Sequence, residues 1–145
     1  MRIAVLADTH DRLPRHIVEA LRGAEEIWHL GDVTLDPILD ELRRLGAPVR
    51  VVRGNCDDNP DWPWELELEV EGFKVLLVHI PPRQPPPGVD LLFHGHTHVP
   101  RNELVGATRY YNLGCITRPN RGAPASWAWL ELKRDQAVGW KQVAV

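Results

Sequence analysis

Acidic, amide and imidazole side chains recur in five short patches of the sequence. The patches are Asp8-Thr9-His10, Gly31-Asp32, Gly54-Asn55-Cys56-Asp57, His79 and Gly95-His96-Thr97-His98. Each patch alone is common in ordinary turns, because Asp and Asn cap turns and Gly permits sharp ones. Together they offer carboxylate, amide and imidazole donors, which suit Mn, Fe, Zn or Ni better than Ca or a structural zinc. We therefore predict metal ligands at Asp8, His10, Asp32, Asn55, His79, His96 and His98.

Hydrolysis of a phosphate ester is the chemistry that such a ligand set would serve. Activation of water at neutral pH takes two divalent cations about 4 Å apart, which lower the pKa of the water and stabilise the transition state. Two such cations repel each other, so we expect a carboxylate to bridge them, and Asp32 is our candidate. Asp8 and His10 are two residues apart, as are His96 and His98, so each pair should project to one side of an extended chain.

The first third of the chain shows the pattern of two consecutive β-α-β units. Continuous apolar runs predict strands at Ile3–Ala7, Glu26–Leu30 and Val49–Val52. Between them, one predicted helix begins at Leu13-Pro14 and ends at Gly23; the other begins at an Asp36 N-cap followed by Pro37 and ends at Gly46. Right-handed crossovers make the three strands parallel, so their carboxyl ends share one edge of the sheet. Asp8, Asp32 and Asn55 follow those ends, where open α/β sheets gather ligand sites.

The rest of the chain predicts strands joined by turns instead of helices. Trp64–Glu71 alternates between apolar and polar residues, and we expect it to form a hairpin with Val75–His79 around Gly72. Ile80–Gly88 contains five prolines and must be a loop. Further strands are predicted at Asp90–Phe93, Thr108–Asn112, Ser126–Leu132 and Ala137–Val143.

Length and composition narrow the class of protein. A chain of 145 residues predicts one domain over residues 1–145, and its net charge of −3 gives no basic field for nucleic acid. The two cysteines fit neither a disulfide framework nor a Cys-x-x-Cys site, so we expect a reducing cytoplasm. The apolar start is too short for a signal peptide, and no run is long enough for a membrane span. The six tryptophans indicate either core positions or an oligomer face. The alternating strand Trp64–Val70 is a candidate edge strand that pairs in a homo-oligomer.

The five patches resemble, in their order along the chain, the motifs of the calcineurin-like metallophosphoesterases. Gly54-Asn55-Cys56-Asp57 is similar to the short bacterial and archaeal phosphodiesterase branch of that superfamily. The resemblance implies a four-layered α/β sandwich, with two β-sheets flanked by helices. It also implies that the first metal takes Asp8, His10, Asp32 and His98, and that the second takes Asp32, Asn55, His79 and His96.

The implied activity is metal-dependent hydrolysis of phosphoesters, preferentially phosphodiesters, by a hydroxide that bridges two divalent metals, with Mn expected first. We assign catalytic roles to Asp32, Asn55 and His10, and substrate contacts to Asn55 and Arg53, with a small phosphoester as substrate. The alternative is a non-catalytic scaffold, because this fold also serves as one in the small retromer subunit. The natural substrate stays open, since many diesters present the same phosphate.

Several residues depart from the superfamily pattern or lie outside it. Cys56 stands where most members have a His that protonates the leaving oxygen, so a general acid is not assured. His94 is a candidate for supporting the ligands, whereas His16 and His29 are expected to be structural or solvated. Four other arginines lie in or beside the motif loops, namely Arg12, Arg83, Arg118 and Arg121. Each either offers a guanidinium to phosphate or is an ordinary surface residue.

Overall fold

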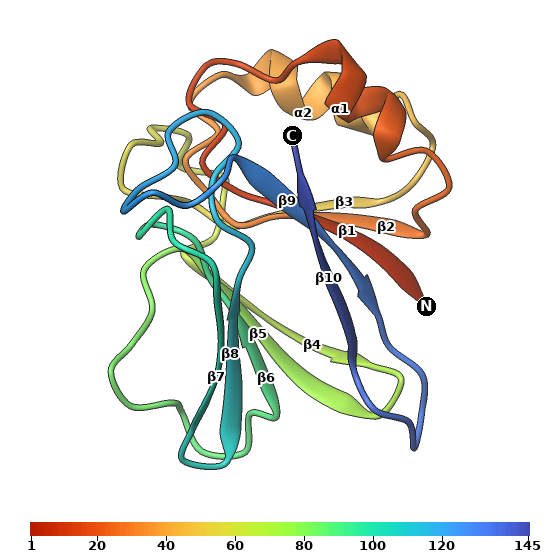
Figure 1. Ribbon diagram of the computed structural model, residues 1–145, viewed down its shortest axis with the longest axis vertical. Helices are drawn as coiled ribbons and strands as arrows, with labels where there is room; N and C mark the ends of the chain where they lie inside the picture. Colours follow the sequence, from red (N-terminus) through yellow and green to blue (C-terminus); the bar gives the residue numbers. More distant parts are fainter.

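Two five-stranded sheets form the protein, in a computed structural model that describes residues 1–145 (Figure 1). The first sheet has the strand order β10-β9-β1-β2-β3. Its strands are β1 (Arg2–Leu6), β2 (Glu26–His29), β3 (Val49–Val51), β9 (Ser126–Glu131) and β10 (Gly139–Ala144). The second sheet has the order β4-β5-β6-β8-β7. Its strands are β4 (Glu65–Val70), β5 (Phe73–Val78), β6 (Leu91–Phe93), β7 (Arg101–Val105) and β8 (Thr108–Asn112).

The predicted β-α-β units are confirmed. Strands β1, β2 and β3 pair in parallel, and the crossovers α1 (Arg15–Ala20) and α2 (Asp36–Arg43) both lie over the outer face of this sheet (Figure 1). The predicted Asp36 N-cap is wrong, because Asp36 is already helical and the cap residue is Leu35. The Asp36 carboxylate in the first turn still favours the helix, since it faces the positive end of the helix dipole. Neither helix has the length and apolar character to cross a membrane.

The second sheet begins with the predicted hairpin of β4 and β5. Glu71 and Gly72 form its two-residue turn, and both have positive φ, as a type I′ turn requires. Strands β5, β6 and β8 then pair in parallel. Strand β7 was not predicted, because it is an edge strand whose residues are mostly exposed and carry no apolar alternation. It pairs with β8 in a second hairpin.

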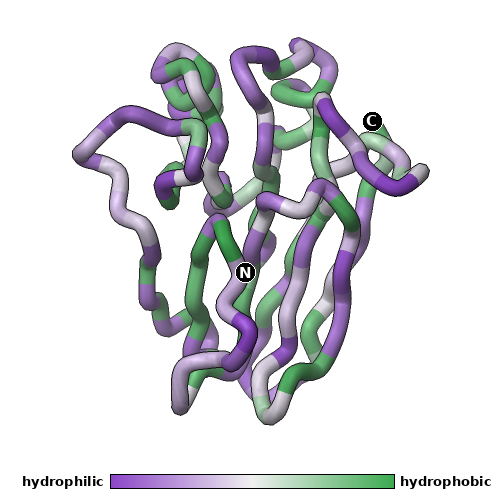
Figure 2. Tube along the Cα trace, turned by 90° about the vertical axis from the view of Figure 1, so that its left-hand side faces the viewer, coloured by the Kyte–Doolittle hydropathy of each residue, from purple (hydrophilic) through white to green (hydrophobic).

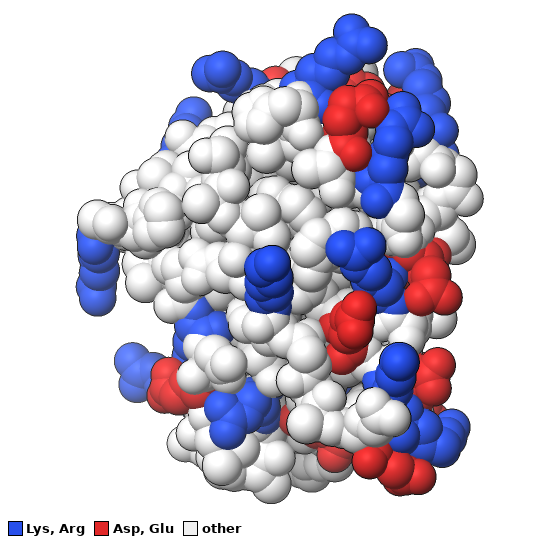
Figure 3. Space-filling view, turned by 45° about the vertical axis from the view of Figure 1, so that its right-hand side comes forward, with Lys and Arg blue, Asp and Glu red and all other residues white.

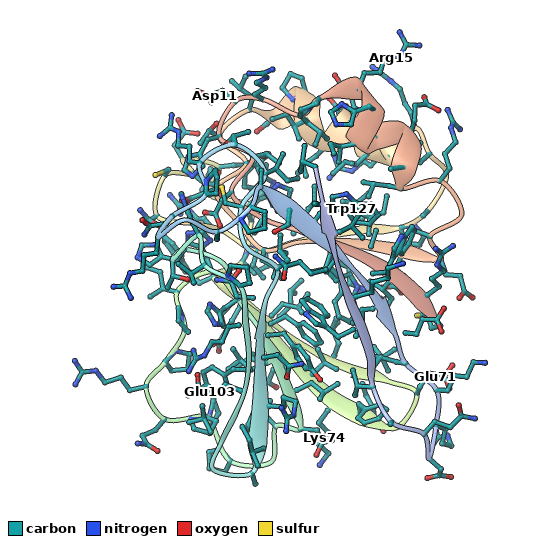
Figure 4. The ribbon with its side chains drawn as sticks, in the orientation of Figure 1. Asp11, Arg15, Glu71, Lys74, Glu103 and Trp127 are labelled. Atoms are coloured by element: carbon teal, nitrogen blue, oxygen red, sulfur yellow. The ribbon has the colours of Figure 1, made fainter.

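The main core lies between the two sheets. Phe93 stacks on Tyr111 with ring centroids 5.1 Å apart and meets Trp28 of the first sheet edge-on at 5.6 Å. Such aromatic contacts add to the apolar area that both sheets bury. Hydrophobic residues accordingly recur along the strands in Figure 2. Trp127 is also buried, beneath the helices (Figure 4).

The outer face of the second sheet is covered by a loop and not by helices. Leu76, Val78, Leu92 and Tyr110 form a small buried cluster on that face, with Val89 packed against it. The Tyr110 hydroxyl donates a hydrogen bond of 2.8 Å to the carbonyl of Pro82, in the proline-rich loop after β5. The predicted sandwich of two sheets is thus confirmed, with its helices on one outer face only.

Parallel strands from both sheets end on the same side of the molecule. The loops that follow β1, β2 and β3 meet the loops that follow β5, β6 and β8 on the left of Figure 1. Asp11 lies among these loops, whereas Glu71, Lys74 and Glu103 lie at the other end of the second sheet (Figure 4). All five sequence patches fall in this group of loops.

Candidate metal centre

The loops after β1 and β2 are held together by backbone hydrogen bonds. Asp8 N–H donates to Gly31 C=O at 2.9 Å, and His10 N–H donates to Asp32 C=O at 3.1 Å. Asp8, His10 and Asp32 all have positive φ, between 43° and 56°. The expected extended Asp-x-His pair is therefore wrong as a description of the backbone. The left-handed turns, together with these bonds, bring the side chains to one place.

The His96 and His98 pair is also left-handed, with φ of 72° and 59°. Of the ten non-glycine residues with positive φ, seven belong to the site loops, namely Asp8, His10, Asp11, Asp32, Thr34, His96 and His98. Each such conformation costs about 1–3 kcal/mol for a residue with a Cβ atom, and such strain tends to gather at functional sites. The concentration of strain here indicates a site that the rest of the fold holds in place.

Two carboxylates lie at the centre of the cluster. Asp8 Oδ1 is 3.2 Å from His98 Nε2, 3.6 Å from His10 Nε2 and 3.7 Å from His79 Nε2. Asp32 Oδ2 is 3.1 Å from His79 Nε2 and 3.6 Å from His10 Nε2. These two oxygens and three Nε2 atoms, five ligand atoms in all, come from four different loops. Both carboxylates are buried, so the space between the five atoms is closed to solvent on one side.

Asn55 and His96 add a second pair of donors. Asn55 Oδ1 and His96 Nδ1 lie 3.0 Å apart, and the His79 and His96 rings are 5.2 Å apart. The His96 backbone N–H donates to Asp8 Oδ2 at 3.1 Å, which ties the second sheet to the central carboxylate. The structure thus brings all seven predicted ligands together, and the assignment of each to a particular metal stays a prediction.

Three buried atoms in this cluster have no hydrogen-bond partner: Asp8 Oδ1, His10 Nε2 and His79 Nε2. Unpaired buried polar atoms cost about 1–3 kcal/mol each, so they call for a ligand. Metal bonds of about 2.0–2.2 Å at angles near 90–110° place ligand atoms about 2.8–3.6 Å apart. The observed spacings of 3.1 to 3.7 Å agree with this range to about 0.1 Å, so the residues fit divalent metal ions.

Backbone carbonyls set the orientation of two of the imidazoles. His79 Nδ1 donates to Leu30 C=O at 2.7 Å, and His98 Nδ1 donates to Arg118 C=O at 2.6 Å. In each ring the Nε2 atom then carries the lone pair and faces a carboxylate. Histidines that bind metals are commonly held in this way.

Glycines allow the loops to approach closely. A Cβ atom at Gly54 would overlap the backbone and carboxylate of Asp32, and one at Gly95 would lie 2.7 Å from Asp8 Oδ2. Glycine is therefore required before Asn55 and before His96, because a side chain at either position would clash. Any other residue would push Asn55 or His96 away from the carboxylates.

Asp57 plays a structural part that the sequence did not reveal. Its buried carboxylate accepts backbone N–H bonds from Asp32 at 2.8 Å, Gly54 at 2.7 Å and Thr34 at 2.8 Å. It therefore clamps the loops after β2 and β3 to each other and fixes the position of Asp32. Its place in the patch Gly54–Asp57 is the one sequence signal of this role.

The histidines outside the ligand set differ in their surroundings. His29 is buried, contacts the Thr9 hydroxyl at 3.1 Å and accepts the Gly31 N–H at 3.2 Å, so it is structural, and burial lowers its pKa to about 3. His94 is also buried, where its Nδ1 donates to Gly95 C=O and its Nε2 accepts from Arg101. Burial lowers the pKa of His94 to about 4, so it is a neutral ring that supports the loop carrying His96. His16 is exposed.

Opposite charges balance within the cluster. Burial alone would raise the pKa of both carboxylates. Contacts with His10 and His98 nevertheless hold the pKa of Asp8 below its usual value. Contact with His79 does the same for Asp32. In return, the pKa of His98 is raised by Asp8, and that of His79 is raised by both carboxylates against the effect of burial. Because imidazole nitrogens bind metals only when they are deprotonated, protons and cations compete for these rings.

Arg53 and Cys56 stand beside the cluster. The Arg53 guanidinium lies 4.5 Å from the ring centroid of the exposed Trp64 and donates from Nε to Asp57 C=O at 3.4 Å. Cys56 is exposed, and its pKa is raised by partial burial and by the Asp32 charge. Arg12, Arg83, Arg118 and Arg121 are exposed, and their contact with substrate stays a prediction, as does that of Arg53.

Comparison with known families agrees with this geometry. The model of the calcineurin-like phosphoesterase superfamily domain matches residues 1–135. The chain belongs to the calcineurin-like phosphoesterase superfamily. Within this superfamily it is 39% identical over 143 residues to a probable metallophosphoesterase of Methanothermobacter thermautotrophicus, a match that covers 86% of this chain and 83% of the relative.

Relatives with other names share the fold. The phosphodiesterase YfcE of Escherichia coli is 29% identical over 162 residues, covering 90% of this chain and 88% of the relative. The solved structure of that phosphoesterase superposes with a TM-score of 0.80, at 27% identity and 99% coverage of both chains. Vps29 from Entamoeba histolytica, solved with Zn²⁺, superposes with a TM-score of 0.77 at 22% identity over 99% of both chains, a likeness that shows the fold alone.

Proposed function

We propose that this phosphoesterase-superfamily chain hydrolyses phosphodiesters with two divalent metal ions held in the cluster described above. The observation that carries the proposal is the trio of buried atoms without partners, Asp8 Oδ1, His10 Nε2 and His79 Nε2, at the spacing of metal ligands. The E. coli relative is named a phosphodiesterase, which favours diesters over monoesters as substrates.

Each half of the cluster is suited to one cation. Asp8, His10 and His98 would hold the first, and Asn55, His79 and His96 the second, with Asp32 shared between them because it lies near both His10 and His79. When bound, the metals supply hydroxide at neutral pH by lowering the pKa of a water molecule, and they offset charge on the phosphate. Mn, Fe, Zn and Ni all accept these donors.

The chain's own groups would orient the phosphate. Asn55 is exposed, so its amide could donate to a phosphate oxygen while its Oδ1, which lies 3.0 Å from His96 Nδ1, would serve as a ligand of the second cation. Arg53 precedes it in the same loop, and a guanidinium can grip a phosphate with two hydrogen bonds. His10 completes the catalytic set because its Nε2 lies close to both central carboxylates.

The alternative of a non-catalytic scaffold predicts a different use of the same fold. Vps29 shares the fold, and the protein has an exposed Trp64 beside the site as a contact for a partner. A scaffold, however, has no need for buried atoms that lack partners, because apolar residues in their place would stabilise the fold more. The enzyme is therefore the better-supported proposal.

A metal-dependent activity assay tests the proposal. Protein stripped with a chelator should not hydrolyse bis(p-nitrophenyl) phosphate, and added Mn²⁺ should restore the activity with two metals bound per chain. Asp32→Asn should lose both, whereas Asp36→Asn, an exposed carboxylate in α2, should retain both as the matched control. Metal binding without any hydrolysis across a panel of phosphoesters would favour the scaffold.

One face of the protein carries charged side chains of both signs. On the face in Figure 3, basic and acidic side chains are interspersed and leave no continuous basic area for nucleic acid. We also propose the reducing cytoplasm as the site of action, in keeping with two free cysteines. A homo-oligomer through Trp64 and the edge strand β4 stays a prediction, which the mass of the protein in solution would test.

A further inference from the structure

The thiol of Cys56 lies within reach of the proposed first metal position. Its Sγ atom, a carboxylate oxygen of Asp32 and a ring nitrogen of His10 all lie within 4.8 Å of one another. By its resemblance to the family, this cysteine stands where most members have a general acid. In the structure it lies beside two of the proposed metal ligands.

His10 provides the independent reason to expect a ligand at this point. Its side chain is only 8% exposed, and its Nε2 atom has no hydrogen-bond partner. That nitrogen lies 3.6 Å from Asp32 Oδ2, and His10 and Asp32 both offer a ligand atom to the group that includes Cys56 Sγ. A polar atom that is buried and unpaired is costly unless something binds it.

The loop holds Cys56 against Asp32. The Cys56 backbone N–H donates to Asp32 Oδ1 at 2.9 Å, which leaves Oδ2 directed at His10 and His79. The Asn55 amide N–H₂ donates to Cys56 Sγ at 3.6 Å. The Cys56 side chain is exposed, and a zinc ion bonds to thiolate at about 2.3 Å.

We propose that Cys56 is a ligand of the first metal position and makes that position select thiophilic cations of the Zn²⁺, Co²⁺ and Cd²⁺ type. This inference rests on the proposed function, because it adds a ligand to the same centre. On binding, the S–H bond breaks, the proton passes to solvent, and a sulfur lone pair forms the bond to the metal. The first position would thus differ from the Mn²⁺ expected from carboxylate, amide and imidazole donors alone.

A consequence for catalysis follows from the same bond. A sulfur atom that is bound to the metal carries no proton, so Cys56 cannot protonate the leaving oxygen. The cysteine would then raise metal selectivity at the expense of general-acid help. Aryl diesters, whose leaving groups need no proton, would be the better substrates.

Cobalt substitution tests the proposal without measuring activity. Metal-free protein is titrated with Co²⁺, and the near-ultraviolet sulfur-to-cobalt charge-transfer band is followed beside the visible d–d bands. Wild type and Cys115→Ser should show the charge-transfer band, because Cys115 is buried and is not part of the cluster of His10 and Asp32. Cys56→Ser should keep the d–d bands and lose the charge-transfer band.

Affinity and chemical protection give two further measurements. Loss of a ligand should weaken Cd²⁺ binding at least as much as loss of a supporting residue does, about 10- to 100-fold, with little change for Mn²⁺. In wild type, Cd²⁺ should protect Cys56 from a maleimide, whereas Mn²⁺ should leave it reactive. This second measurement needs no variant, so it does not depend on whether Cys56→Ser folds.

The outcomes separate the two proposals. Visible cobalt bands with no charge-transfer band in wild type would overturn the role of Cys56 and leave the two-metal proposal standing. Equal maleimide protection by Cd²⁺ and Mn²⁺, with equal Cd²⁺ affinity in Cys56→Ser, would overturn it as well. Absence of any cobalt binding to wild type would overturn both proposals.

Discussion

Replacement of Asp57 by Asn should loosen the metal centre although Asp57 is not one of its proposed ligands. The Asp57 carboxylate is 7% exposed and accepts three backbone N–H bonds of 2.7 to 2.8 Å from two loops. Asn has nearly the same shape but only one oxygen. If that oxygen faces Asp32 and Gly54, its amide N–H₂ faces the N–H of Thr34, and that donor loses its partner.

The magnitude follows from these bonds. Hydrogen bonds to a charged acceptor contribute about 1.5–3 kcal/mol against about 0.5–1.5 for neutral ones, and a buried donor without a partner costs about 1–3 kcal/mol. Because Thr34 is only partly buried, water can offset some of its loss. We expect Asp57→Asn to lower the free energy of unfolding by about 2–4 kcal/mol.

The metal affinity should fall as well. Asp32 has a φ of 56°, and its backbone N–H is held by the Asp57 carboxylate, so the weaker bond to a neutral amide oxygen lets the turn relax. Loss of such a supporting residue typically weakens metal binding by about 10- to 100-fold. A shift of Asp32 in the variant is thus expected to raise the Mn²⁺ concentration needed for half-maximal loading by that factor.

Urea unfolding of the metal-free protein and Mn²⁺ titration of the folded protein measure the two effects separately. The midpoint of unfolding should drop with an unchanged m value, since the surface exposed on unfolding stays the same. The matched control is Asp58→Asn, because Asp58 is the exposed carboxylate next in the chain. If Asp57→Asn and Asp58→Asn unfold within about 0.5 kcal/mol of each other, the clamp has no energetic role and the reasoning fails.

Three other predictions concern the site and its support. Asp32→Ala should abolish hydrolysis with little change in the melting temperature of the metal-free protein, since the Asp32 carboxylate is proposed to hold metal ions and not to pack in the core; an equal loss of both would show a structural role. Across a series of diesters, the rate should fall steeply as the leaving group becomes more basic, because proton donation, worth about 10²- to 10⁴-fold, is lacking, and Cys56→Ser should give the same slope. Burial lowers the pKa of His29 to about 3, so between about pH 6.5 and pH 3 the unfolded chain binds a proton that the folded chain does not. The free energy of unfolding should therefore fall by about 1.4 kcal/mol for each pH unit of acidification in this window. His29→Gln should remove that share of the pH dependence of urea unfolding, and unchanged pH dependence would contradict the assignment of a neutral His29.

Much of the site could be predicted from the sequence because its parts are local. Apolar runs separated by helical stripes predict parallel strands, and parallel strands deliver Asp8, Asp32 and Asn55 to one edge of a sheet. The turn at Glu71-Gly72 was predictable for the same reason, since two neighbouring residues carry the signal. Ligand chemistry also needs no coordinates, because donor atoms belong to residue types.

Tertiary structure alone decided how those parts meet. The left-handed turns at Asp8 and His96 depend on hydrogen bonds to residues far along the chain, so no local pattern shows them. Strand β7 has no apolar alternation and exists because β8 offers it a partner. The clamp by Asp57 and the approach of Cys56 to His10 likewise require two loops to be packed together. Sequence determines which donors each loop carries, whereas the distances between loops follow from the packing of two sheets, which is a property of the whole fold.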